Sequence, residues 1–130
     1  MCIRDRHFFD EDRRALLENN ALAADNLDFF FELVRQSGDS SANLLQNLYS
    51  CRKPAEQGIP LGIMMSKRFL GKSGAVRVHG GGFAGTIQAF VPTKGTEDYV
   101  KEMEALYGEG SCYVLRIRPV GGFSFASAVR

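Results

Sequence analysis

The stretch GAVRVHGGGFAGTIQAFV, residues 74–91, decides the fold class. Apolar and polar side chains alternate from Ala75 to His79, with Val76 and Val78 on one face, and this alternation predicts a half-buried strand. A second strand is predicted from Thr86 to Val91, ended by Pro92. Because the connection between the two strands is short and rich in glycine, we expect them to be antiparallel neighbours.

Helical patterns lie on both sides of this stretch. Upstream, apolar spacing predicts helices over Glu11 to Ala24, Asp28 to Gln36, Ala42 to Tyr49 after an N-cap at Ser40 or Ser41, and Pro60 to Leu70 with Gly71 as C-cap. Downstream, the pattern predicts a helix Glu97 to Tyr107 capped by Thr96, a third strand Ser111 to Arg118, and an edge strand or frayed end over Gly121 to Arg130. Helices packed on a small antiparallel sheet make an α+β domain.

Composition narrows the class of protein. The 130 residues suit one domain, and 45% hydrophobic with 24% charged residues is ordinary for a globular chain. A net charge of +1 without a basic run gives no support for a nucleic-acid partner. No apolar run approaches the ~20 residues of a membrane span, and the charged N-terminus does not resemble a signal peptide, so a cytoplasmic protein is expected. Three widely spaced cysteines fit neither a disulfide framework nor a zinc site.

The glycine cluster is the sharpest chemical signal. Gly80, Gly82 and Gly85 match the spacing of the dinucleotide-binding fingerprint, but that fingerprint opens a helix and here a strand follows. No Lys-Ser or Lys-Thr follows Gly85, which excludes a P-loop. A plain hairpin turn and an anion-binding loop of backbone N–H groups both stay open. Three adjacent glycines exceed the need of a two-residue turn, which favours the functional loop.

The same residues carry a resemblance to a known family. Residues 74–91 resemble the third glycine-rich signature of galactokinases, within the galacto-, homoserine, mevalonate and phosphomevalonate kinase superfamily. Residues 33–38 (LVRQSG), 40–41 (SS) and 45–49 (LQNLY) resemble the preceding segment in galactokinases of the clostridial kind, and residues 108–110 and 116–119 (RIRP) their C-terminal part. The resemblance covers about residues 7 to 122, with Ala84 where the family commonly has glycine. It implies a ferredoxin-like C-terminal kinase lobe.

The resemblance implies a transferase that moves the γ-phosphoryl group of ATP to the 1-hydroxyl of galactose, with ATP and Mg²⁺ required in the full enzyme. It places a glycine loop beside the nucleotide and sugar, comprising Gly80, Gly81, Gly82, Phe83 and Gly85. Further candidates are His79, Ser40, Ser41 and Asn47. The catalytic residues are expected in an N-terminal lobe that this sequence lacks, so no catalytic or metal-binding residue is assigned and the chain alone is expected to be inactive.

The domain boundaries follow from the same resemblance. Residues 1–6 resemble the translated end of a sequencing adapter and are predicted to be non-native, whereas residues 7–130 form the predicted kinase lobe. Three alternatives stay open: another small-molecule kinase of the superfamily, a non-catalytic sensor that binds sugar and nucleotide, and a free-standing α+β ligand-binding module.

Overall fold

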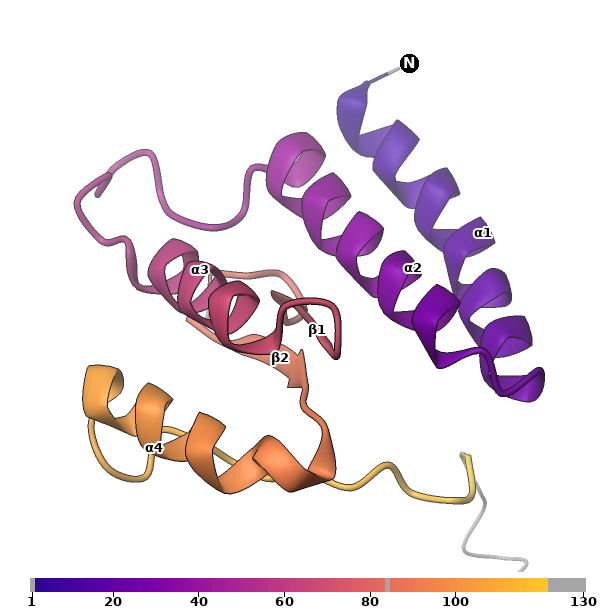
Figure 1. Ribbon diagram of the computed structural model, residues 1–130. Coiled ribbons are helices and arrows are strands. Elements are labelled where there is room, and N and C mark those ends of the chain that lie inside the picture. Colours follow the sequence, from indigo (N-terminus) through magenta and orange to yellow (C-terminus); the bar gives the residue numbers. More distant parts are fainter. Residues whose placement is uncertain (1, 84, 122–130) are drawn as a thin grey trace, which may run out of the picture.

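A computed structural model of the chain describes residues 2–83 and 85–121. Helices α1 (Ile3–Ala23) and α2 (Leu27–Ser40) form an antiparallel hairpin, and α2 packs on strand β1 (Ala75–Val78) (Figure 1). Strand β2 (Ile87–Phe90) completes a two-stranded sheet. Helices α3 (Gly58–Leu70) and α4 (Thr96–Tyr107) pack against each other beside this sheet. The α+β prediction is therefore confirmed.

The two strands are antiparallel, as the 74–91 stretch predicts. Ala75 lies opposite Phe90 and Val78 lies opposite Ile87, and the His79 N–H donates to the Thr86 carbonyl at 3.0 Å beyond the strand ends. Gly74 comes just before β1 in the chain and lies very close to β2. A Cβ at this position would be 2.2 Å from the Phe90 carbonyl oxygen. A side chain at position 74 would therefore force the strands apart.

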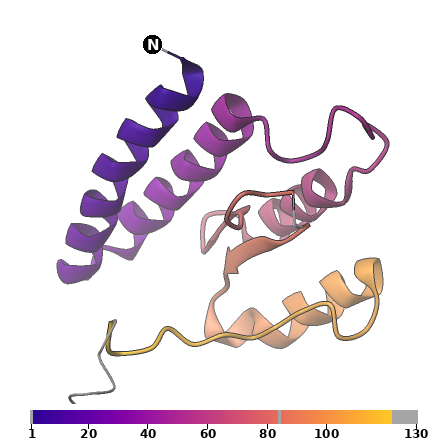
Figure 2. The same ribbon diagram turned by 180° about the vertical axis from the view of Figure 1, so that it is seen from behind.

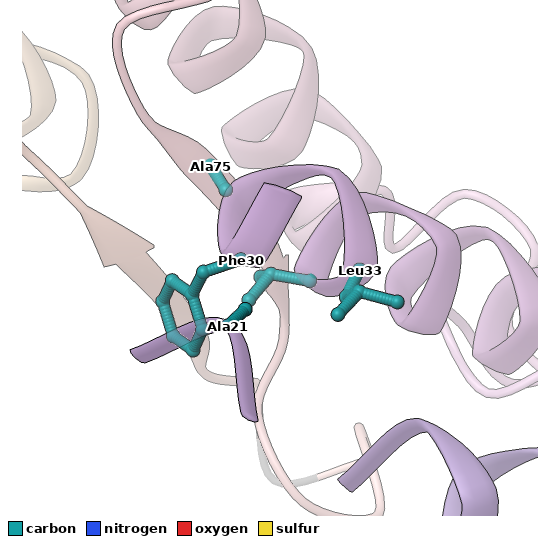
Figure 3. Packing of buried hydrophobic residues seen from close by; sticks show 5 residues of the cluster. Ala21, Phe30, Leu33 and Ala75 are labelled. Atoms are coloured by element: carbon teal, nitrogen blue, oxygen red, sulfur yellow. The ribbon is translucent and has the colours of Figure 1, made fainter. Parts of the chain in front are cut away.

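The apolar core lies between the helical hairpin and the sheet. Ala21 of α1, Leu33 and Phe30 of α2 and Ala75 of β1 are buried together (Figure 3). The Phe30 ring meets the Phe90 ring edge-on, with their centroids 5.2 Å apart. Because these residues come from four different elements, the core ties the hairpin to both strands.

A second set of contacts joins α3 and α4, which lie side by side in both views (Figure 2). The hydroxyl groups of Ser66 and Tyr99 are 2.7 Å apart and buried, and the Tyr99 ring contacts Phe69. At the other end, the Tyr107 hydroxyl donates to the Gly58 carbonyl at 2.6 Å. Pro60 lies in the first turn of α3 and Gly71 caps it, as predicted.

Several boundary predictions are wrong. The first helix begins at Ile3, because the Asp5 carboxylate accepts the free Cys2 N–H at 2.8 Å and Arg6 pairs with Asp10. The adapter origin predicted for residues 1–6 stays a prediction. The last helix is capped by Gly95, and Thr96 is already its first residue, because a 3₁₀ turn Thr93–Gly95 leads directly into it.

The predicted helix from Ala42 to Tyr49 is also wrong. Instead, α2 continues into a π-helical turn, Ser41–Leu45, which ends where Gln46 takes a left-handed conformation (φ 55°). The Gln46 N–H then donates to the Ser41 carbonyl at 3.2 Å. The leucines that suggested a separate helix therefore belong to a widened, π-helical end of α2 and the chain that leaves it.

The third strand, predicted from Ser111 to Arg118, does not form. This segment has no ladder partner within the described residues, and Tyr113, Leu115 and Ile117 are 82%, 85% and 86% exposed. Alternation alone cannot make a strand where no neighbouring edge accepts its backbone hydrogen bonds. The strand predicted beyond Gly121 lies outside the described residues.

Candidate functional site

The glycine loop connects β1 to β2 through two successive tight turns. The Gly82 N–H donates to the His79 carbonyl at 3.3 Å, and the Gly85 N–H donates to the Gly82 carbonyl at 2.9 Å. Gly80, Gly82 and Gly85 have φ values of 57°, 87° and 82°, a region that side chains disfavour. The loop is therefore larger than a two-residue hairpin turn, and the three glycines meet its backbone requirement.

One face of the loop is open to solvent. His79, Gly80 and Gly81 are exposed, and Phe83 is 69% exposed. Within residues 2–83 and 85–121, no acceptor is assigned to the N–H groups of Gly80 and Gly81. Adjacent unpaired N–H groups of this kind can receive an anionic oxygen. The exposed face thus offers backbone donors to a ligand such as a phosphate group.

The opposite face of the loop packs on the chain that follows α2. Gly82 is buried, and a Cβ at this position would lie 2.2 Å from the Asn47 carbonyl oxygen. Asn47 itself is only 1% exposed. Gly82 is therefore required for its close approach as well as for its positive φ.

Asn47 is tied to the end of α2 by its side chain. Its amide nitrogen donates to the Ser41 hydroxyl at 3.0 Å, and that hydroxyl lies 3.3 Å from the Asn47 amide oxygen. Ser41 is 1% exposed, so both partners of this pair are buried. The structure thus brings two of the predicted candidates, Ser41 and Asn47, into contact with each other, and Asn47 also contacts the loop at Gly82.

Ser40 belongs to a different neighbourhood. Its hydroxyl lies 2.9 Å from the His7 Nδ1 atom, on the side of α2 that faces α1. Burial lowers the pKa of His7, and the nearby positive charges of Arg14 and Arg77 lower it further. Ser40 therefore takes part in helix packing rather than in contacts of the glycine loop.

A polar cluster outside the glycine loop joins α1, α2 and β1. The Arg77 guanidinium binds the Glu11 carboxylate (Nη1 to Oε2, 3.4 Å) and the Ser37 hydroxyl, which donates to the same carboxylate at 2.5 Å. Ser37 is fully buried. Burial lowers the pKa of Arg77, an effect that the Glu18 carboxylate opposes, and burial raises the pKa of Glu18. The alternation in β1 predicted that Arg77 lies on the other face of the strand from the valines. The structure identifies its partners as Glu11 and Ser37.

No residue of the glycine loop lines the small cavity found among the described residues. This cavity of about 70 Å³ lies between α2, α3 and β1, lined in part by Asp39, Lys67 and Arg77. The cavity is large enough to hold ordered water. No cluster of three metal-binding side chains occurs in residues 2–83 and 85–121.

Comparison with known proteins points to one enzyme. The chain is similar to a galactokinase. It is 32% identical over 98 residues to the protein named Galactokinase from Mannheimia succiniciproducens, a match over 75% of this chain and 24% of the relative. The chain thus spans about a quarter of the length of that protein. This similarity supports the galactokinase resemblance, although it does not test the clostridial subtype.

The other comparisons add no further relative. No protein-family model matches the chain, and no solved structure matches it. None of the helices within the described residues has the length and apolarity to cross a bilayer.

Proposed function

We propose that this chain is the C-terminal part of a galactokinase, which transfers the γ-phosphoryl group of ATP to the 1-hydroxyl of galactose. The observation that carries the proposal is the 32% identity to a galactokinase over 98 residues. The exposed glycine loop supports it, because phosphoryl transfer depends chiefly on the positioning of phosphates and the stabilisation of their charge.

In this proposal the loop forms one wall of the active site. Gly80 and Gly81 are exposed, their N–H groups have no acceptor among the described residues, and such donors suit the oxygen atoms of a nucleotide phosphate. Phe83 and His79, both exposed, flank these donors. The galactokinase resemblance implies that the Mg²⁺ ligands and the catalytic base belong to the N-terminal lobe, and we propose no such role for residues of this chain.

The experiment is a complementation assay. The chain is co-expressed with the N-terminal part of the Mannheimia succiniciproducens galactokinase, and ATP-dependent phosphorylation of galactose is measured. We expect activity from the pair and none from either part alone. Replacement of Gly82 by Trp should abolish the activity, because the loop can no longer lie on Asn47.

Three outcomes would redirect the proposal. Activity with another alcohol substrate but not galactose would indicate a different kinase of the superfamily. Binding of galactose and ATP without product would indicate a sensor. A soluble, folded chain that neither complements the partner nor binds ATP would reduce the loop to a turn, and the proposal would be wrong.

A further inference from the structure

We propose that the buried Ser41–Asn47 pair positions the glycine loop. By holding the Asn47 main-chain carbonyl in place, the pair would fix the surface on which Gly82 packs and hence the direction of the Gly80 and Gly81 N–H groups. The identity of the bound group, the phosphates of ATP, rests on the proposed function. The placement of the loop rests on contacts within this chain.

The first step is that the Asn47 carbonyl has little freedom. The chain reverses between Ser41 and Asn47 through the π-helical turn and the left-handed Gln46. The side-chain amide of Asn47 and the Ser41 hydroxyl close this reversal with a buried hydrogen bond of 3.0 Å. Buried polar pairs whose partners are satisfied favour one geometry over its alternatives. The pair therefore holds residue 47 in a single position at the end of α2.

The second step is that the loop follows this carbonyl. Gly82 is the residue at which the two turns of the loop join, since its N–H closes the first turn and its carbonyl accepts the bond of the second. Gly82 is buried whereas Gly80, Gly81 and Phe83 are exposed. With room for no more than a hydrogen atom between Gly82 and Asn47, a shift of the carbonyl would move both turns.

The third step is that the two faces of the loop differ in their contacts with the rest of the chain. Gly82 contacts protein, whereas a Cβ at Gly80 or Gly81 would meet no atom within 4 Å. The exposed Gly80 and Gly81 thus have no neighbouring side chain or backbone that would hold their N–H groups in place. Their order in the absence of a ligand depends on the contact beneath them, which makes Ser41 and Asn47 positioning residues.

Amide hydrogen exchange tests this directly on the 130-residue chain. Ser41→Ala and Asn47→Ala are expected to speed exchange of the Gly82 and Gly85 amides about tenfold, as loss of a buried hydrogen bond should, while β1 amides change less. Ser66→Ala is the matched control, because it removes an equally buried hydroxyl that binds Tyr99 in the α3–α4 contact. In that control the Gly82 and Gly85 amides should keep their exchange rates relative to β1.

Two results would overturn the proposal. One is a folded Ser41→Ala chain in which the Gly82 and Gly85 amides exchange at wild-type rates. The other is equal acceleration of the loop and of β1, which would show that the pair contributes only to global stability. Ser41→Ala removes a single hydroxyl, so it keeps the test decisive if Asn47→Ala does not fold.

A kinetic measurement separates this inference from the proposed function. In the complemented enzyme, Ser41→Ala should raise KM for ATP about tenfold, in line with loss of one buried hydrogen bond, and Ser66→Ala should not. An unchanged KM in active Ser41→Ala enzyme would contradict the positioning role. If the wild-type pair of fragments has no kinase activity, the proposed function is wrong, and hydrogen exchange still decides whether the pair orders the loop.

Discussion

Replacement of the loop glycines by alanine, one at a time, should separate steric contact from backbone strain. At Gly82 an added Cβ would lie 2.2 Å from the Asn47 carbonyl oxygen, and φ is 87°. Overpacking of this kind costs about 1–3 kcal/mol, and a left-handed side chain adds about 1 kcal/mol. Gly82→Ala should therefore destabilise the chain by about 2–4 kcal/mol, a large share of the ~5–15 kcal/mol that holds a typical domain folded.

The neighbouring glycines are the matched controls. Gly80 shares the positive φ but faces open space, so Gly80→Ala should cost only about 1 kcal/mol. Gly81 has neither a positive φ nor a close neighbour, and Gly81→Ala should change stability by less than about 0.5 kcal/mol.

Urea unfolding followed by circular dichroism measures all three variants. In thermal unfolding, Gly82→Ala should lower Tm by about 6–16 °C, at ~3–4 °C per kcal/mol for a chain of this size. If Gly82→Ala proves no more destabilising than Gly80→Ala, the close contact with Asn47 does not exist in solution and the reasoning fails.

Three further predictions concern other parts of the chain. Arg77→Met should cost about 1–2 kcal/mol in urea unfolding, because it removes the hydrogen bonds of Arg77 to the Glu11 carboxylate and the Ser37 hydroxyl, although Arg14 still pairs with Glu11, and the loss should be less than additive with Glu11→Gln; additive losses would refute the pairing. The pKa of His7 is lowered in the folded chain, so the unfolded state takes up a proton first and stability should fall as pH drops below about 6.5; a His7→Asn chain with the same pH dependence would exclude this origin. The apolar side chains of Leu115 and Ile117 are each more than four-fifths exposed, so the wild-type chain should self-associate, and Leu115→Arg with Ile117→Arg should reduce this association in light scattering; a wild-type chain that stays monomeric at high concentration would contradict this.

The sequence predicted the β1–β2 pair well because the signals for it are local. Alternation in Ala75 to His79, the short glycine connection and Pro92 together specify an antiparallel pair, and the structure has this pair. Helix positions were also largely predictable from apolar spacing. Their ends were less so, because the Cys2–Asp5 contact and the 3₁₀ turn before Thr96 depend on single hydrogen bonds.

The failures share one physical cause, which is dependence on distant partners. Leu44, Leu45 and Leu48 have helical spacing, but the π-helical end of α2 and the left-handed Gln46 prevent a new helix. The segment from Ser111 to Arg118 alternates like a strand, but no described edge pairs with it.

The candidate site was likewise predictable where its signals are local and not where it depends on distant partners. Its glycines were evident from the sequence as a cluster with unusual backbone freedom, and Ser41 and Asn47 were named beside them through resemblance. That Gly82 packs on Asn47 while Gly81 stays free depends on a contact between residues 35 positions apart, which no local pattern reports.

The two-faced loop also changes how natural variation at these glycines should be interpreted. The fold alone disfavours any side chain at position 82, because it would collide with Asn47. A conserved glycine at this position would therefore be expected even in a protein that had lost its ligand. Gly81 experiences no such constraint from the chain itself. Purifying selection at Gly81, rather than at Gly82, would therefore record the ancestral presence of a bound molecule against the loop.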